Sequence, residues 1–139
     1  MCDIMEKTEL KLEYRVCENN AGIPVIVVAA GTSSRMNGTN KQLALLGGIP
    51  VLMRTLSIFE KSNSISNIIL VTRDEDLFQI QMLCNKYNIT KISDIVCGGN
   101  SRQESVLKGF ARLKTDDINV LIHDGARPFV DGAIIDNVC

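Results

Sequence analysis

Two cationic side chains, Arg35 and Lys41, stand in a loop of small and polar residues that suits the binding of a polyphosphate. The loop covers residues 29–42 and has the sequence Ala-Ala-Gly-Thr-Ser-Ser-Arg-Met-Asn-Gly-Thr-Asn-Lys-Gln. Short side chains let backbone N–H groups approach an anion closely, and the two cations add fixed positive charge. An ordinary strand-to-helix turn with two surface cations is the alternative interpretation of the same residues.

The spacing within this loop excludes two better-known phosphate-binding loops. A P-loop ends in Gly-Lys-Ser/Thr, but Met36 and Asn37 stand where its second glycine and its lysine would be. A dinucleotide-binding fingerprint has further glycines at two positions that are Ser33 and Met36 in this chain. The loop is therefore a different kind of phosphate site.

A second loop suited to a nucleotide starts at Gly98-Gly99-Asn100 and continues through Arg102 and Ser105. Glycine allows a ligand to approach the backbone closely, and Arg102 and Ser105 fall on the first turn of the next expected helix. A glycine C-cap followed by a capped surface helix explains the same residues if this loop is considered alone.

The third loop covers residues 123–128 and has the sequence His-Asp-Gly-Ala-Arg-Pro. A carboxylate beside a polyphosphate is the hard oxygen ligand that Mg²⁺ prefers, which makes Asp124 the candidate metal ligand. Considered alone, Asp124 also fits a turn residue or a helix cap. Because side chains alternate along a strand, His123 should point away from Asp124, which predicts a packed residue rather than a catalyst.

The elements that must position these loops alternate between strand and helix from residue 23 onward. This alternation indicates an α/β fold with a Rossmann-like, mostly parallel sheet flanked by helices. We expect strands at 23–28, 67–72, 91–97 and 119–123, helices at 51–61, 75–87, 101–113 and 131–138, and a hairpin or bend at Gly47-Gly48. The expected caps are Asp74, Ser101 with Glu104, and Asp131. Carboxyl ends of parallel strands share one edge, so the three loops should converge on one crevice.

We divide the chain into an N-terminal extension, residues 1–22, and a domain, residues 23–139. Within the extension, apolar and charged residues alternate from Leu10 to Val16. This period predicts a half-exposed edge strand, with a disordered leader as the alternative.

Composition excludes several classes of function. The net charge is −1, aromatic residues make up 4% and tryptophan is absent, so we expect no binding to nucleic acid or to an anionic membrane. A single histidine excludes a multi-histidine metal centre, and the five cysteines are scattered without a CxxC pair. Because the apolar runs are short and the charged N-terminus lacks a signal-peptide core, we expect a cytoplasmic protein with reduced thiols.

In this order and spacing, the motifs Ala-Ala-Gly-x-x-x-Arg-Met, Lys-Gln, Gly-Gly-x-x-Arg-x-x-Ser-Val and His-Asp-x-Ala-Arg-Pro resemble one family. It is the 2-C-methyl-D-erythritol 4-phosphate cytidylyltransferases of the non-mevalonate isoprenoid pathway, and the resemblance spans residues 23–138. The ribitol-5-phosphate cytidylyltransferases are similar, but typically have Ala-Gly-Gly in place of Ala29-Ala30-Gly31. Ser33 departs from a glycine that is usual in the family. Because family members are usually much longer, we expect a nucleotide-binding part whose fold is truncated on its C-terminal side.

The resemblance implies a fold of the nucleotide-diphospho-sugar transferase type and an enzyme that moves CMP from CTP to 2-C-methyl-D-erythritol 4-phosphate, releasing pyrophosphate. It implies that Arg35 and Lys41 are catalytic, that Asp124 holds Mg²⁺, and that the full-length family forms homodimers acting on small-molecule substrates. The residues that it implies for nucleotide binding are Ala29, Ala30, Gly31, Gly99, Asn100, Arg102, Ser105, Asp124, Gly125 and Arg127.

Two interpretations from other classes remain beside this one. A non-catalytic CTP-binding module would keep all three loops and make no product. A flavodoxin-like or receiver domain would leave Arg35 and Lys41 without a role, and the first loop lacks the paired acids that a receiver needs.

Overall fold

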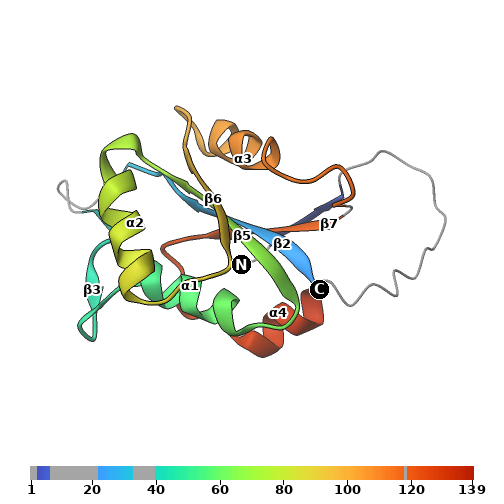
Figure 1. Cartoon of the computed structure of the whole chain (residues 1–139), viewed down its shortest axis with the longest axis horizontal. Helices are drawn as coiled ribbons and strands as arrows, with labels where there is room; N and C mark the ends of the chain where they lie inside the picture. The colour runs from blue at the N-terminus through green and yellow to red at the C-terminus, as the bar shows by residue number, and fades with distance from the viewer. Residues whose placement is uncertain (1–2, 7–21, 33–39, 118) are drawn as a thin grey trace.

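The computed structural model describes residues 3–6, 22–32, 40–117 and 119–139 (Figure 1). The strands are β1 (Asp3–Glu6), β2 (Ile23–Ala29), β3 (Leu45–Leu46), β4 (Ile49–Pro50), β5 (Ile65–Thr72), β6 (Ile92–Cys97) and β7 (Asn119–Asp124). The helices are α1 (Val51–Lys61), α2 (Leu77–Lys86), α3 (Arg102–Phe110) and α4 (Gly132–Val138), and a 3₁₀ turn (Asp74–Asp76) precedes α2. None of the helices in these ranges is long and apolar enough to cross a membrane.

The main sheet has the strand order β1-β7-β2-β5-β6. Strands β7, β2, β5 and β6 are parallel, and β1 pairs with β7 in the antiparallel direction at one edge. The chain passes from β2 to β5 and β6 on one side, then returns to β7 on the other side of β2. The space beyond the carboxyl ends of β2 and β7 is therefore a topological switch point, where open α/β sheets bind ligands.

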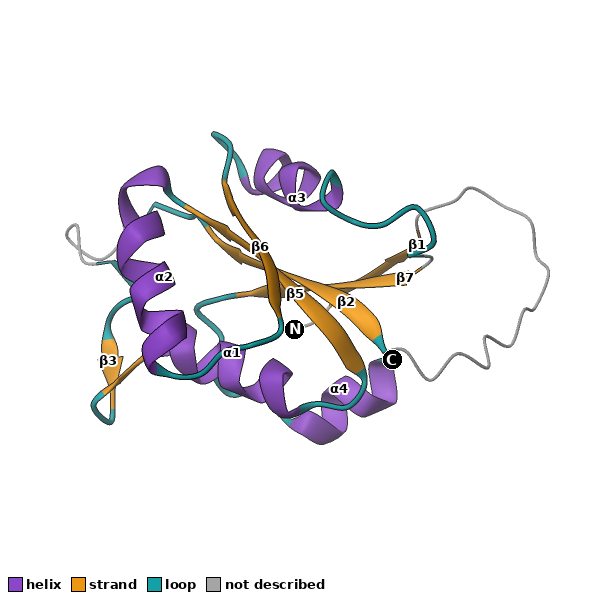
Figure 2. Cartoon of the chain, viewed as in Figure 1, coloured by secondary structure: helices purple, strands orange, loops and turns teal. Residues whose placement is uncertain are grey.

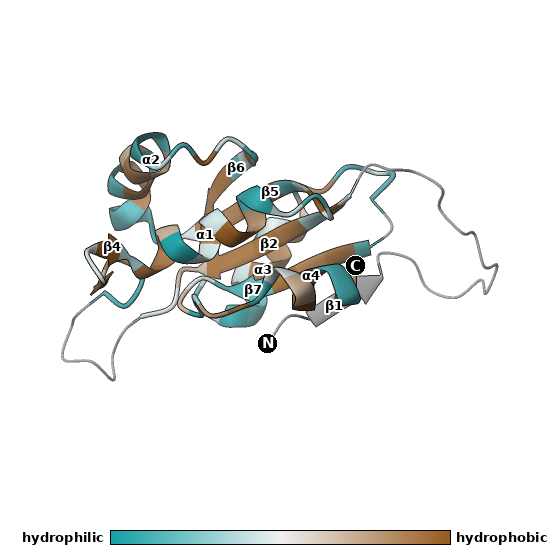
Figure 3. Ribbon diagram, turned by 90° about the horizontal axis from the view of Figure 1, so that it is seen from below, coloured by the Kyte–Doolittle hydropathy of each residue, from teal (hydrophilic) through white to brown (hydrophobic). Residues whose placement is uncertain are grey.

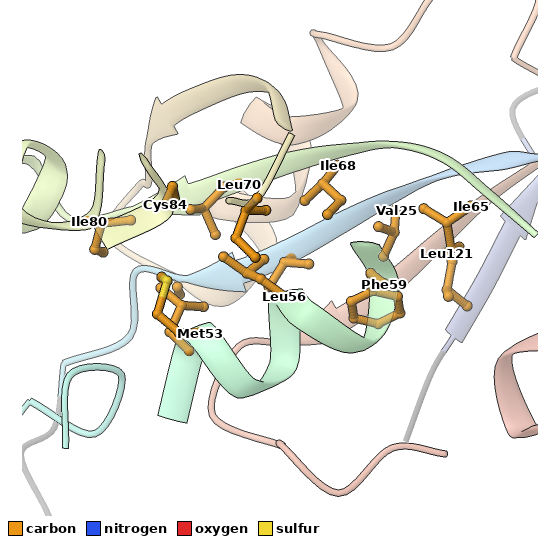
Figure 4. Packing of buried hydrophobic residues seen from close by; sticks show 14 of the residues in the cluster. Val25, Met53, Leu56, Phe59, Ile65, Ile68, Leu70, Ile80, Cys84 and Leu121 are labelled. Carbon is orange, nitrogen blue, oxygen red and sulfur yellow. The ribbon is translucent and has the colours of Figure 1, made fainter. Parts of the chain in front are cut away.

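Helices cover both faces of this sheet (Figure 2). On one face α1, α2 and α4 pack against alternate strand residues such as Val25 and Leu70, and Figure 4 shows Leu56 and Phe59 of α1 among them. On the other face α3 packs against the residues in between, such as Ile26 and Val71. Figure 3 shows the central strands β2, β5 and β7 apolar along most of their length, as burial on both faces requires.

The expected α/β class with a mostly parallel sheet is confirmed, and α1 has the expected bounds. The hairpin is also confirmed, because β3 pairs with β4 and the turn between them places Gly47 at φ 60° and Gly48 at φ 78°. These left-handed conformations cost glycine little. The alternating segment from Leu10 to Val16 lies outside the described residues, and the short strand β1 was not expected.

The helix expected at 75–87 starts differently from the prediction. Asp74 is not its cap: residues Asp74–Asp76 form the 3₁₀ turn, and the N-cap position of α2 is Asp76. The Asp131 cap is confirmed, since its carboxylate accepts the Ala133 N–H at 3.1 Å. Of the capping box predicted for α3, the Ser101 half is confirmed, since its hydroxyl accepts the Glu104 N–H at 3.1 Å, whereas the Glu104 carboxylate accepts the Asn100 N–H and not that of Ser101.

Candidate active site

A cavity of about 870 Å³ lies at the carboxyl ends of the four parallel strands. Each strand contributes the segment that follows it, and the stretch before the β3–β4 hairpin contributes two more residues. The lining residues are Val28, Ala30, Gly31, Thr32, Lys41, Gln42, Arg73, Asp74, Gly98, Gly99, Asn100, Ser101, Arg102, Ser105, Asp124, Ala126 and Arg127. The convergence of the three predicted loops on one crevice is thus observed.

Hydrogen bonds to side chains hold the loop between β6 and α3. The Ser105 hydroxyl is buried, accepts the Gly99 N–H at 3.1 Å and donates to the Ser101 carbonyl at 2.9 Å. The Glu104 carboxylate accepts the Asn100 N–H at 2.6 Å, one residue earlier than the N-cap N–H of a standard capping box. Since these bonds join the loop to the first turn of α3, the backbone groups of the loop are positioned before any ligand binds.

Glycine is required where this loop meets the end of β2. A Cβ on Gly98 would lie 2.3 Å from the Ala30 Cβ and 2.8 Å from the Ser105 Oγ, both far inside normal contact distance. The Gly98 N–H also donates to the Thr72 carbonyl at 2.8 Å. The absence of a side chain at this position lets the second loop close against the first.

The charged groups of the cavity are arranged around Asp124. One carboxylate oxygen is 3.3 Å from Arg102 Nη2, and the other is 3.2 Å from Arg127 Nε. Arg73, directly after β5, contacts Glu75 and Asp76 at 2.7 Å each, and the hydrogen bond that its guanidinium donates to the Asp76 carboxylate raises the pKa of Arg73. With Lys41, four cationic side chains among the described residues line the cavity against two carboxylates, so this part of the wall favours an anionic ligand.

The turn after β7 is held by residues on the face of the sheet that α1 covers. His123 is 1% exposed, packs edge-on against Phe59 with ring centroids 5.1 Å apart, and places Nε2 3.0 Å from the Arg127 carbonyl oxygen. Burial lowers the pKa of His123, so its imidazole is held neutral. The Gly125 carbonyl accepts the Thr55 hydroxyl at 2.8 Å and the Gly125 N–H donates to Val28 at 2.9 Å. The prediction of a packed histidine is confirmed.

Most of the predicted site residues that the structure describes lie on the cavity wall. They are Ala30, Gly31, Lys41, Gly99, Asn100, Arg102, Ser105, Asp124 and Arg127. Two others do not: Ala29 is fully buried in the hydrophobic core, and Gly125 is buried with both backbone groups bonded within the protein. Arg35 falls in residues 33–39, outside the described part of the chain.

Sequence reasoning missed the contribution of β5. Arg73 and Asp74 follow this strand and line the cavity, as the other strand ends do. The sequence contained a signal for this contribution, because the charged residues 73–76 directly follow the apolar strand predicted at 67–72. Gln42 was also missed. It lines the cavity, is 7% exposed, and has a side-chain oxygen for which the described residues provide no hydrogen-bond partner.

Metal binding here would depend on the ligand as well as the protein. Within the described ranges there is no group of three or more His, Cys, Asp or Glu residues that could hold a metal ion. Asp124, with a side chain 30% exposed at the cavity, is a single hard carboxylate. This donor set fits Mg²⁺, which usually binds through one or two carboxylates together with substrate phosphates.

The family model for 2-C-methyl-D-erythritol 4-phosphate cytidylyltransferase, IspD, matches residues 23–139. The chain belongs to the IspD family. An IspD relative from Halalkalibacterium halodurans, named 2-C-methyl-D-erythritol 4-phosphate cytidylyltransferase, is 46% identical over 107 residues, which cover 76% of this chain and 46% of the relative. A relative of the same name from Clostridium novyi is 47% identical over 114 residues, which cover 81% of this chain and 49% of the relative.

The solved structures agree with this membership. The crystal structure of 4-diphosphocytidyl-2C-methyl-D-erythritol synthase from Anaerococcus prevotii matches with a TM-score of 0.71 and 30% identity, covering 85% of this chain and 49% of that chain. The chain thus spans about half the length of the IspD relatives that it matches. The family match starts at Ile23, the first residue of β2, and includes all the residues that line the cavity.

Proposed function

We propose that the cavity binds CTP with Mg²⁺ and serves the transfer of CMP to 2-C-methyl-D-erythritol 4-phosphate, an early step in isoprenoid precursor synthesis. The observation that carries this proposal is the convergence of the three loops that contain the family motifs on one cavity, whose described cations outnumber its described carboxylates. Membership of the IspD family supports the choice of CTP and of this acceptor.

In the proposed reaction, an oxygen of the acceptor phosphate attacks the α-phosphorus of CTP. The bond from that phosphorus to the oxygen bridging the α- and β-phosphates breaks, and pyrophosphate leaves with the electron pair. Negative charge develops on the phosphoryl oxygens, so cations placed beforehand stabilise the transition state more than the ground state. We assign this role to Arg35 and Lys41.

The remaining residues bind and orient the nucleotide. Arg102 and Arg127 form ion pairs with Asp124 at the cavity wall, and we assign their two guanidinium groups to binding of the triphosphate. Backbone groups at Ala30, Gly99 and Asn100, with the Ser105 hydroxyl, form the surface for cytosine. When bound at Asp124, Mg²⁺ would neutralise part of the triphosphate charge and favour departure of pyrophosphate.

We further propose the cellular location, the oligomeric state and the domain organisation of the enzyme. The family resemblance supports a cytoplasmic enzyme that acts as a homodimer, with residues 1–22 as an extension of the domain at 23–139. Small molecules are its proposed substrates.

Titration calorimetry on the 139-residue chain tests nucleotide recognition. CTP should bind more tightly than ATP or GTP, and removal of Mg²⁺ by chelation should weaken the binding. Equal affinity for the three nucleotides would refute the cytosine assignment.

Pyrophosphate release tests the reaction itself. A version of the chain extended to the length of its IspD relatives is incubated with CTP, Mg²⁺ and either 2-C-methyl-D-erythritol 4-phosphate or ribitol 5-phosphate, and release should be faster with the former. Binding of CTP without release under either condition would instead support a nucleotide-binding module. The 139-residue chain alone should release little or no pyrophosphate, because it spans about half the length of those relatives.

A further inference from the structure

Lys41 lies in a turn whose backbone is held by hydrogen bonds on both sides. The Asn40 carbonyl accepts the N–H groups of Leu43 at 3.2 Å and Ala44 at 3.1 Å, which closes the turn around Lys41. The Gln42 carbonyl accepts the Leu52 N–H at 2.9 Å, which ties the turn to α1. The backbone that carries Lys41 is therefore attached to a rigid helix.

The Asn40 side chain adds a second attachment. Its Oδ1 accepts the Gln42 N–H at 3.0 Å, so it bridges the two residues that flank Lys41 in sequence. Its Nδ2 donates to the Asp76 carboxylate at 2.9 Å, which joins the turn to the start of α2. One amide thus fixes the local conformation and its position relative to another element.

Asp76 has features that a capping residue would not show. It occupies the N-cap position of α2, but its side chain caps no N–H of that helix. It is 7% exposed, and its Oδ2 accepts both from Asn40 Nδ2 and from Arg73 Nε, the latter at 2.7 Å. Arg73 and Lys41 both line the cavity, so Asp76 and Asn40 connect two of its four described cations.

We propose that Asn40 and Asp76 are positioning residues, which orient Lys41 toward the nucleotide phosphates and hold it in register with Arg73. This inference rests on the proposed function, because it assumes that Lys41 contacts the triphosphate. A lysine side chain is long and flexible and does not hold its own ammonium group in place. The position of the backbone therefore sets the region that the ammonium group can reach. An error of about 1 Å at a reacting group is enough to weaken its contribution severely.

A double-mutant cycle on Mg²⁺–CTP affinity tests the proposal with the 139-residue chain. Lys41→Ala should weaken binding about tenfold, the usual effect of losing one charge-assisted hydrogen bond. Asn40→Ala and Asp76→Ala should each weaken it about threefold to tenfold by misplacing that lysine. In the Lys41→Ala background, Asn40→Ala should alter the affinity less than about twofold, because the group that it positions is gone. Asp76→Ala should keep a larger effect there, because it also removes the partner of Arg73.

Two further variants separate positioning from general damage to the fold. Asn67→Ala is the matched control, because Asn67 donates one hydrogen bond between elements, to Ser93 at 2.9 Å, away from the cavity. It should leave the CTP affinity unchanged. Asn40→Ser keeps a hydroxyl that can accept the Gln42 N–H but cannot reach Asp76, so its effect should lie between those of wild type and Asn40→Ala.

Amide hydrogen exchange provides a readout independent of nucleotide binding. The Gln42 N–H should exchange at least about tenfold faster in Asn40→Ala than in wild type, because its acceptor is lost. Unchanged exchange at Gln42 would show that the bridge is absent, and would overturn the inference.

The affinity results distinguish failure of the inference from failure of the proposed function. If the effects of Asn40→Ala and Lys41→Ala multiply in the double variant, Asn40 acts through general structure and the inference is wrong. If Lys41→Ala leaves the CTP affinity unchanged, Lys41 does not contact the bound triphosphate in the ground state, and the positioning inference fails while the proposed reaction stands. If the chain binds no CTP, the proposed function itself fails.

Discussion

Replacing Gly98 with alanine should both destabilise the domain and weaken nucleotide binding. The new Cβ would lie 2.3 Å from the Ala30 Cβ, while carbon atoms in good contact are about 3.5–4.0 Å apart, so the two loops must separate by more than about 1 Å. Neither neighbour can yield by rotation, because Ala30 has no rotatable side chain and hydrogen bonds to Gly99 and Ser101 hold the Ser105 hydroxyl.

The size of the effect follows from these contacts. Overpacking of this kind costs about 1–3 kcal/mol, and the loss of one Ser105 hydrogen bond adds about 1 kcal/mol. We therefore expect the free energy of unfolding to fall by about 2–4 kcal/mol, which for a chain of this length lowers the melting temperature by roughly 10 °C. Since Ala30, Gly99 and Ser105 line the cavity, the affinity for CTP should fall by about tenfold or more.

Urea denaturation followed by circular dichroism measures the first effect, and calorimetric titration with CTP and Mg²⁺ at low temperature measures the second. Gly132→Ala is the matched control, because a Cβ there meets no atom within 4 Å and the residue lies at the start of α4, away from the cavity. It should leave CTP affinity unchanged and unfolding free energy unchanged or slightly higher. A Gly98→Ala protein with wild-type stability and affinity would refute this account of how the loops close.

Three further predictions concern protonation, the nucleotide loop and the cations. Burial lowers the pKa of His123, so below about pH 6.5 the unfolded chain takes up a proton that the folded protein excludes. Above that pH the free energy of unfolding is unaffected by His123. As the pH falls from there to the pKa of His123 in the folded protein, the free energy of unfolding should fall by up to about 1.4 kcal/mol per pH unit. His123→Gln should lack this component in pH-dependent denaturation, since the chain has one histidine. Ser105→Ala leaves the Gly99 N–H without its acceptor, and should cost about 1–2 kcal/mol in denaturation and weaken CTP binding measured by calorimetry. In a version of the chain extended to the length of its IspD relatives, Lys41→Ala and Arg35→Ala should each lower turnover by roughly 10²–10³ in a pyrophosphate-release assay, with a smaller loss of CTP affinity. Near wild-type turnover would show that the residue is only a surface charge.

Local pattern was a reliable guide to the elements but not to all of their ends. The period of apolar residues predicted α1 and the four parallel strands, because burial of a helix face or of both faces of a strand imposes a regular spacing. The start of α2 was predicted incorrectly, because Asp74 and Asp76 are both suitable N-cap residues by sequence. Strand β1 was missed, since its pairing with β7 joins segments more than a hundred residues apart.

The candidate site was also predicted in part from the sequence. Its three loops could be predicted because parallel strands place their carboxyl ends at one edge of a sheet. Whether a loop residue faces the cavity depends on how the neighbouring elements pack, and this buries Ala29 and Gly125 behind the wall. The same packing brings Arg73 into the cavity and joins Asp76 to Asn40, although 36 positions separate the last two in sequence.

The sequence by itself determined the α/β class, the three loops and their family resemblance, because these follow from hydrophobic spacing and from short motifs within single segments. Only the tertiary structure decided which side chains share the cavity, which charges pair with Asp124, and what holds the turn that carries Lys41. The physical reason is the distance along the sequence over which each interaction acts. Hydrophobic period and backbone preference act over a few neighbouring residues, while hydrogen bonds and ion pairs depend on distances that the packing of helices on the sheet sets.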